Sequence, residues 1–253
     1  MKIQLISDAH LNMEHEFSVL NPEAEVFIMA GDMASSPKAA KKYLTDLRKQ
    51  TKIPIIYVLG NHEYYGLNLY TGLDAYRKAV SKIKGVHLLE KQGLELEGIS
   101  FWGTTLWSDL SDPLAAWAVQ DGLSDYLFIE REPGTYIRAL DTHTEYLLAL
   151  DWLKTALTEN LERKNIVITH HAPCWECRNT YFDYDHRNRL ITHGFCNRLD
   201  TLMHVYNISH WLYGHTHKSQ SLRVGGTQVV SNQVGYEHEK KQSGFDRQQL
   251  IDV

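Results

Sequence analysis

The sequence predicts an α/β fold built on a parallel or mixed β-sheet, and two observations support this fold class. Short runs of apolar and β-branched residues alternate with segments of helical spacing; the runs lie at residues 2–7, 25–30, 53–59, 165–169 and 209–213. A run that is apolar at almost every position is typical of a strand buried on both faces. Each run is also followed by polar residues of the types that bind metal ions. The 253 residues are enough for one large domain or two small ones.

The first predicted helix follows the second run. Residues 38–50 have helical spacing, and Ser35, Ser36 and Pro37 come directly before them. Serine is a favoured N-cap residue and proline suits the first helical turn, so we expect the helix to begin here. Residues 73–83 form the next predicted helix, and glycine turns then separate three short predicted strands, at residues 86–90, 94–96 and 99–104.

The longest helical pattern lies at residues 141–159. Leucines recur on or near one face of this helix and are expected to pack into the core, namely Leu147, Leu148, Leu150, Leu153 and Leu157. Residues 106–133, in contrast, have no clean period and are expected to form loops and short helices.

The C-terminal part of the chain is expected to contain a helix at residues 195–206 and a β-hairpin around Gly225 and Gly226. The tail after Gly235 is charged, and we expect it to lie at the surface.

Charge and composition limit the functions that the chain can have. Its 26 Lys and Arg against 31 Asp and Glu give a net charge of -5, so bulk attraction to nucleic acid or to an anionic membrane is not expected. The chain has no apolar stretch of the roughly 18 residues that a membrane span needs, and its N-terminus does not resemble a signal peptide. Together with only 3 cysteines, these features predict a cytoplasmic protein.

Polar residues follow the predicted strands at the point where each strand ends. Because ligands of α/β sheets bind at the carboxyl ends of the strands, these side chains are expected to converge. Two of them, His215 and His217, lie two positions apart, and in extended backbone both rings would point the same way. The candidate metal ligands are Asp8, His10, Asp32, Asn61, His170, His215 and His217.

The candidate ligands comprise two carboxylates, one amide oxygen and four imidazoles. One ion cannot bind all seven donor groups and keep a coordination position open, whereas two ions that share a bridging carboxylate can. Mixed nitrogen and oxygen donors favour Mn, Fe, Zn, Co or Ni over Ca. Two ions about 3.5–4 Å apart would suit an in-line attack at phosphorus.

These residues resemble the calcineurin-like metallophosphoesterases, whose pattern is D-x-H, G-D, G-N-H-(D/E), a His after a strand, and G-H-x-H. The chain contains these blocks in that order, over residues 8–217: Asp8-Ala9-His10, Gly31-Asp32, Gly60-Asn61-His62-Glu63, His170-His171 and Gly214-His215-Thr216-His217. The resemblance implies a four-layer α/β/β/α sandwich of two mixed β-sheets, with the metal site at the C-terminal ends of the strands. It also implies a single domain over residues 1–253, in which residues 107–140 and 175–193 are candidates for cap-like insertions.

The resemblance further implies a role for each ligand. One ion would be held by Asp8, His10 and His217, and the other by Asn61, His170 and His215. Asp32 would bridge the two ions. His170 is preferred to its neighbour His171 because it directly follows the strand.

The implied activity is hydrolysis of phosphate mono- or diesters by a hydroxide that two divalent ions activate, with manganese favoured. His62 and Asp32 are the candidate catalytic residues, and His62 would contact the phosphate and protonate the leaving group. A small phosphoester or a nucleotide-type molecule is the expected substrate. No membrane partner is expected, and the oligomeric state is left open.

Several alternatives remain at this level. The protein could be a metal-binding scaffold without activity, or a nuclease of the same superfamily, although the net charge disfavours a nuclease. Arg178, Arg187 and Arg189 either face the crevice, where they would grip a phosphate, or lie on a solvated loop. Cys174 and Cys177 are either a redox pair or two incidental thiols, and we favour the second interpretation.

Overall fold

The computed structural model describes residues 1–11, 20–182, 184–239 and 242–253. Its larger strands form two sheets. The first sheet has the order β13-β1-β2-β3-β4 and the second has the order β11-β12-β10-β9-β6-β5. The bounds of the first sheet's strands are β1 Lys2–Ile6, β2 Val26–Ala30, β3 Ile55–Val58, β4 Val86–Leu88 and β13 Ile251–Asp252. Those of the second sheet are β5 Gln92–Leu96, β6 Ile99–Thr104, β9 Lys164–Thr169, β10 Ile208–Tyr213, β11 Gln220–Val224 and β12 Thr227–Ser231.

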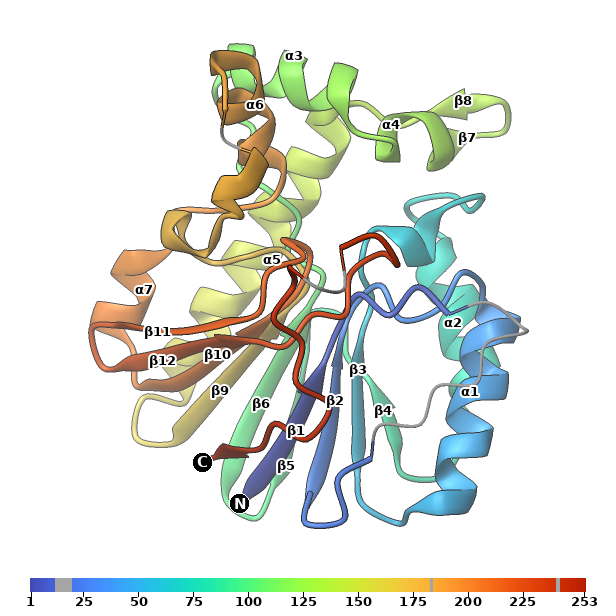
Figure 1. Ribbon diagram of the computed structural model, residues 1–253, viewed down its shortest axis with the longest axis vertical. Coiled ribbons are helices and arrows are strands. Elements are labelled where there is room, and N and C mark those ends of the chain that lie inside the picture. The colour runs from blue at the N-terminus through green and yellow to red at the C-terminus, as the bar shows by residue number, and fades with distance from the viewer. Residues whose placement is uncertain (12–19, 183, 240–241) are drawn as a thin grey trace.

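Both sheets are mixed, as the sequence predicts. Strands β1 to β4 are parallel to one another, and β13 joins β1 antiparallel at the edge. In the second sheet β6, β9, β10 and β12 are parallel, while β5 and β11 pair antiparallel at the two edges. The parallel strands of each sheet end on the same side of the molecule (Figure 1).

Helices cover the sheets and extend beyond their strand ends. The two helices beside the first sheet are α1 Pro37–Gln50 and α2 Gly72–Val80. Those beside the second sheet are α5 Ala139–Glu159 and α7 Asp200–Val205 (Figure 1). Beyond the strand ends lie α3 Pro113–Gly122, α4 Asp125–Phe128, α6 His186–Ile191 and the small hairpin of β7 Glu130–Glu132 and β8 Thr135–Tyr136 (Figure 1).

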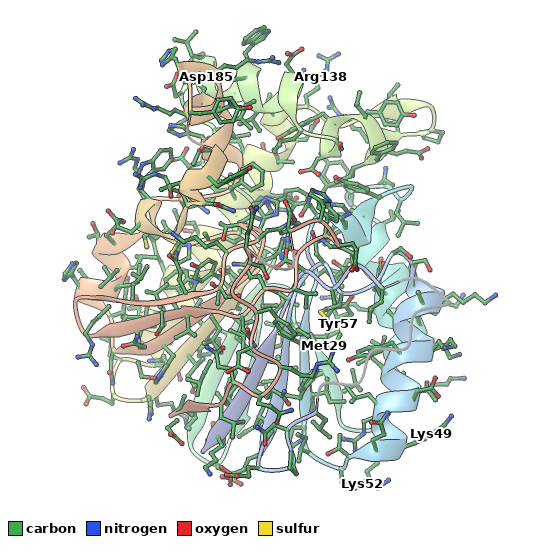
Figure 2. All side chains as sticks on the ribbon, viewed as in Figure 1. Met29, Lys49, Lys52, Tyr57, Arg138 and Asp185 are labelled. Atoms are coloured by element: carbon green, nitrogen blue, oxygen red, sulfur yellow. The ribbon has the colours of Figure 1, made fainter. Side chains whose placement is uncertain are left out.

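The apolar core between the two sheets follows from the two-residue period of the strands. Alternate side chains point inward from both sheets and form one buried cluster, which includes Ile3, Leu5, Val26, Ile28, Ile56, Val58, Phe101, Ile166, Ile168 and Leu212. The residues between them, such as Met29 and Tyr57, face the helices, whereas Lys49 and Lys52 point outward (Figure 2). Strands buried on both faces explain the near-continuous apolar runs of the sequence.

The first helix begins where the sequence predicts. Ser36 is the N-cap of α1, its hydroxyl accepts a hydrogen bond from the backbone N–H of Ala39 at 3.2 Å, and Pro37 occupies the first turn. Helix α2 begins and ends within three residues of its predicted bounds. The segment 106–133 forms loops and short helices as expected, and it also contains the strand β7, which the sequence pattern does not predict.

Two expectations about helices are wrong. In α5, Leu147 and Leu148 are 49% and 53% exposed, so they do not pack into the core. Leu153 and Leu157 are buried as expected, and Leu150 packs against the core. Tyr146 and Ala149 complete the buried stripe, at the spacing of a helix face. Only Asp200–Val205 is helical within the predicted helix 195–206. No helix in the described part of the chain is long and apolar enough to cross a membrane.

Candidate metal centre

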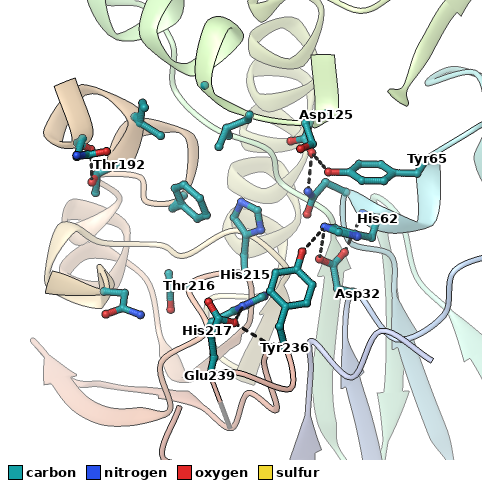
Figure 3. A pocket seen from close by; sticks show the side chains of 18 residues that line it. Asp32, His62, Tyr65, Asp125, Thr192, His215, Thr216, His217, Tyr236 and Glu239 are labelled. Carbon is teal, nitrogen blue, oxygen red and sulfur yellow. Dashed lines mark hydrogen bonds and ion pairs between the residues drawn. The ribbon is translucent and has the colours of Figure 1, made fainter. Parts of the chain in front are cut away.

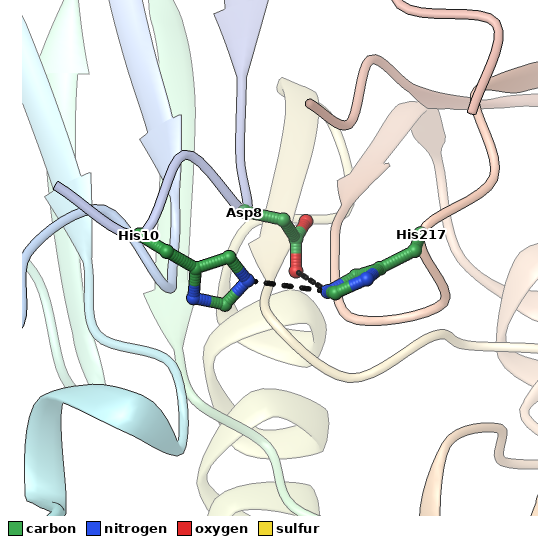
Figure 4. A group of neighbouring side chains, drawn as sticks. All are labelled: Asp8, His10 and His217. Atoms are coloured by element: carbon green, nitrogen blue, oxygen red, sulfur yellow. Dashed lines mark hydrogen bonds and ion pairs between the residues drawn. The ribbon is translucent and has the colours of Figure 1, made fainter. Parts of the chain in front are cut away.

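The seven candidate ligands converge at the shared end of the strands. Their side chains form three groups in which the potential ligand atoms all lie within 4.8 Å of one another. One group contains Asp8, His10 and His217 (Figure 4). Another contains Asp32, His170 and His215, and the third joins His10 and Asp32 to His62. Asn61 completes the set, because its Oδ1 lies 2.9 Å from Nε2 of His170.

The backbone of the ligand loops has an unusual conformation. Five candidates have positive φ, which costs free energy for residues other than glycine and is often found at functional sites. The φ values are 56° at Asp8, 48° at His10, 52° at Asp32, 73° at His215 and 50° at His217. The expectation that extended backbone directs His215 and His217 to one point is therefore wrong. The left-handed backbone sends the two rings to different groups instead.

The glycine that precedes a ligand leaves room for close contacts at two of these loops. A Cβ on Gly60 would lie 2.1 Å from Oδ1 of Asp32 and 2.7 Å from Nε2 of His170. A Cβ on Gly214 would lie 2.8 Å from Oδ2 of Asp8. A side chain at either position would displace the ligands, so the motif requires glycine there.

Three of the histidines are oriented through one ring nitrogen, which leaves the other available. Nδ1 of His170 hydrogen bonds to the carbonyl of Ala30 at 2.9 Å, and Nε2 of His215 contacts the carbonyl of Gly194 at 3.3 Å. Nδ1 of His217 hydrogen bonds to Oε2 of Glu239 at 2.5 Å (Figure 3). Histidines that bind metals are usually oriented in this way, with the second nitrogen bonded to a carbonyl or carboxylate.

His171 has a different position from His170. Its Nδ1 hydrogen bonds to the carbonyl of Thr105 at 3.2 Å, and its ring lies against Trp107. Burial and the neighbouring His170 lower the pKa of His171 to about 3. Among the described residues, the groups of potential ligand atoms include His170 and do not include His171.

The charges of the site are suited to cations. Asp8 and Asp32 are buried at 0% and 1% exposure. Burial alone would raise the pKa of Asp32, but His170 and His62 outweigh it and hold this pKa well below its usual value. Burial would lower the pKa of His170, yet Asp32 raises it to about 9. The buried carboxylates thus attract positive charge, and the donor set of nitrogen and oxygen atoms without a thiolate fits divalent cations.

A cavity of about 350 Å³ opens beside these groups (Figure 3). Its wall includes Asp32, His62 and His215 at the metal end, and residues of α3, α6 and the segments next to them at the other end. The described lining contains no Lys or Arg, so it contradicts the alternative in which Arg178, Arg187 and Arg189 face the crevice. Arg187 pairs with Asp121 instead, and the segment contributes Asn179, Asn188 and Ile191 to the wall.

Comparison with known proteins identifies the family of this chain. The model of the calcineurin-like phosphoesterase family matches residues 1–219. The chain belongs to this family. Its members are metal-dependent hydrolases of phosphate esters, and this phosphoesterase has the two mixed sheets, flanked by helices, of the family fold.

Relatives of the phosphoesterase support this assignment. An uncharacterized protein, L509 of Acanthamoeba polyphaga mimivirus, is 31% identical over 210 residues, which are 79% of this chain and 73% of that protein. The fold is similar to that of phosphopantetheinyl hydrolase from Mycobacterium tuberculosis, with a TM-score of 0.75, 17% identity and coverage of 99% of this chain and 95% of that one. A dimetal phosphatase from Danio rerio has a TM-score of 0.51 and 11% identity, over 92% of this chain and 87% of that one.

The sequence does not reveal several residues that hold the site of the phosphoesterase together. Asp125, at the start of α4, is buried, and its Oδ1 accepts hydrogen bonds from Nδ2 of Asn61 and from the hydroxyl of Tyr65, both at 2.7 Å (Figure 3). Because the amide nitrogen of Asn61 is bonded to Asp125, its oxygen faces His170. Burial raises the pKa of the Asp125 carboxyl.

Glu63 belongs to a motif but has no predicted role, and the structure gives it one. Its carboxylate accepts hydrogen bonds from the hydroxyl of Tyr57 and from four backbone N–H groups, those of Asp32, Met33, Ala34 and Gly60. It therefore fastens the loop after β2 to the loop after β3. Burial and the nearby Asp32 raise the pKa of Glu63.

The C-terminal segment 236–239 reaches the site, although the tail is expected to lie at the surface. The hydroxyl of Tyr236 lies 3.1 Å from Nε2 of His62. Glu239 contacts His217 as described above. Burial would lower the pKa of His217, but Asp8 and Glu239 raise it to about 10. No motif or periodicity marks these two residues; a charged segment after the last strand is the only signal.

The two cysteines of the C-x-x-C motif are buried, with 3.2 Å between their sulfur atoms. The contact with Cys177 and burial raise the pKa of Cys174, so the reactive thiolate is disfavoured.

Proposed function

We propose that this phosphoesterase hydrolyses small organic phosphate esters at a centre of two divalent ions. One ion would be held by Asp8, His10 and His217, and the other by Asn61, His170 and His215, with Asp32 between them. The observation that carries the proposal is the pair of adjoining ligand groups, which the close approach of His10 and Asp32 connects. Divalent ions bound there supply Lewis acidity to the phosphoryl oxygens and lower the pKa of water.

His62 is suited to act on the leaving group. Its backbone N–H donates to Oδ1 of Asp32 at 2.9 Å, which places the residue at the edge of the ligand groups. The ring is 27% exposed, and it lines the cavity. A proton on this ring can be donated to the oxygen that leaves phosphorus, which is general acid catalysis.

The chemistry of the cavity supports a substrate with one phosphoryl group and an uncharged remainder. Away from the candidate ligands, its wall combines apolar side chains, such as Leu123, Ile191 and Phe195, with uncharged polar ones and the carboxyl groups of Asp125 and Glu239, which bond to other protein groups. Since no described Lys or Arg lines it, the positive charge for a phosphate is concentrated at the metal end. This distribution weighs against a polyphosphate or a nucleic acid strand, which need cationic groups along their length.

We propose that residues 107–140 and 175–193 act as the cap over a single domain.

The proposal is tested by hydrolysis of p-nitrophenyl phosphate and of bis(p-nitrophenyl) phosphate after reconstitution with Mn²⁺. Turnover of at least one ester is expected, with loss on chelation and recovery when metal is returned. The ratio of kcat/KM for the two esters distinguishes a phosphatase from a phosphodiesterase. No turnover of either ester by protein that contains two equivalents of metal would favour a metal-binding scaffold.

A further inference from the structure

The C-terminal segment 236–239 lies beyond residue 219, where the family match ends, and it contacts both sides of the metal centre. We propose that Tyr236 is a positioning residue for His62, and that Glu239 fastens this segment to the ligand His217. The inference rests on the proposed function, because it assigns a task within the same site.

Three contacts define the position of the His62 ring. Tyr65 stacks on it, with 4.2 Å between ring centroids and 24° between planes, and His10 approaches at 4.6 Å and 61°. These ring contacts limit where the imidazole lies but do not distinguish its nitrogens from its carbons. The hydroxyl of Tyr236, 3.1 Å from Nε2, provides that distinction. Asp32 does not provide it, since its Oδ2 lies 3.8 Å from Nε2, beyond hydrogen-bond length.

Tyr236 is itself held from two sides. Its ring stacks on His10, with 4.5 Å between centroids and 20° between planes. Its backbone N–H donates to Oε2 of Glu239 at 3.0 Å, and the same oxygen accepts from Nδ1 of His217. The segment is thereby attached to one ligand by stacking and to another by a shared carboxylate oxygen. Tyr236 also lines the cavity, so its hydroxyl fixes Nε2 of His62 beside the space for the substrate.

The effect of the Tyr236 hydroxyl on turnover should depend on the leaving group of the ester. When Nε2–H donates to the Tyr236 hydroxyl, its proton is kept on the cavity side. The N–H bond then breaks as the leaving oxygen takes this proton, and the neutral imidazole remains. A ring free to turn over would present a carbon there part of the time. Phenol, with a pKa of about 10, is a poor leaving group and needs this proton. p-Nitrophenolate is a much weaker base than phenolate and leaves well without this proton.

The test compares Tyr236→Phe with the wild type on p-nitrophenyl and phenyl esters of the same phosphate class. Phenylalanine keeps the stacking on His10 and removes only the hydroxyl. We expect kcat for the phenyl ester to fall about tenfold or more and kcat for the p-nitrophenyl ester to change less than about threefold, with KM and metal content unchanged. In a His62→Ala background the same substitution should have no further effect. Tyr206→Phe, at the end of α7, is the matched control, because its hydroxyl contacts Thr158 and it does not line the cavity.

A second measurement does not depend on turnover. In the metal-free protein, the ¹⁵N resonance of Nε2 of His62 is expected to shift on Tyr236→Phe and to stay unchanged on Tyr206→Phe. Equal losses on both esters, loss of metal, additive effects with His62→Ala or an unchanged resonance would each overturn the inference. If wild-type protein hydrolysed no ester, the proposed function would fall, while the resonance would still decide whether the hydroxyl holds the ring.

Discussion

The candidate metal centre is built by two regions of the molecule that present their side chains in different ways. The strand-end loops that carry Asp8, Asp32 and His170 continue directly from buried strands, and their hydrogen bonds join one loop to the next. The peripheral segments, which are α4 with Asp125 and the C-terminal segment 236–239, enter from outside the two sheets and contact the centre through single side chains.

The strand-end loops place the candidate ligands, whereas the peripheral segments orient them. The sheets fix where the loops end, and the positive φ values and close-packed glycines keep the ligands within reach of one another. The peripheral side chains bond to the second polar atom of a ligand, such as Nδ2 of Asn61 or Nδ1 of His217. Substitutions of the candidate ligands in the loops should therefore abolish binding or catalysis, whereas those of the peripheral side chains should weaken it.

The largest effect is expected at Asp32, which is close to both ligand groups. Asp32→Ala removes the carboxylate between them, so both ions and at least about a thousandfold of activity should be lost. Metal content after dialysis and turnover of the p-nitrophenyl esters measure these losses. Asp74→Ala, whose side chain is 77% exposed on α2, is the control and should retain both. An Asp32→Ala protein that holds two equivalents of metal would contradict the bridging role.

A smaller effect is expected at His62, because its role concerns the leaving group rather than the ions. For a phenyl ester, whose leaving group needs a proton, His62→Ala should lower kcat by roughly 10²–10⁴-fold while the protein keeps the bound metal. Metal analysis and kcat of the same preparation separate the two effects. If His62→Ala lost metal but turned over normally after reconstitution, His62 would be a metal ligand and not a general acid.

The same difference explains what the sequence predicts and what it does not. Asp8, Asp32 and His215 directly follow apolar runs, so one strand pattern reveals both the sheet and the convergence of the ligands. Asp125 and Tyr236 have no such mark. Their contacts depend on how α4 and the C-terminal segment pack against the sheets, and this is a tertiary property that no local spacing encodes. Leu147 and Leu148 illustrate the opposite error, since apolar residues outnumber the positions on the buried face of α5.

Asp125 tests the peripheral region directly. Asp125→Ala removes the acceptor that holds Nδ2 of Asn61, so the amide can turn its oxygen away from His170. We expect the affinity for metal to fall about 10–100-fold and turnover to recover at saturating metal. Asp125→Asn keeps an acceptor oxygen and should retain most of the affinity. Metal titration followed by turnover measures both, and equal losses in the two variants would show that the orientation of Asn61 is not the cause.

The smallest effect on activity is expected at Glu63, which belongs to a motif but binds only protein groups. Glu63→Gln places an amide N–H₂ among backbone N–H donors, and leaving such buried groups unpaired costs about 1–3 kcal/mol. The free energy of unfolding should fall by this amount, while turnover with saturating metal at 25 °C should stay within about tenfold of the wild type, because no ligand atom is removed. Denaturant unfolding measures the first and the p-nitrophenyl esters the second. Glu95→Gln, at an exposed pair with Arg163, is the control and should change the free energy of unfolding by less than about 0.5 kcal/mol. Unchanged stability together with a loss of metal would mean that Glu63 orients the ligands as the peripheral residues do. The motif would then contain residues of both kinds, those that bind metal and those that orient a ligand.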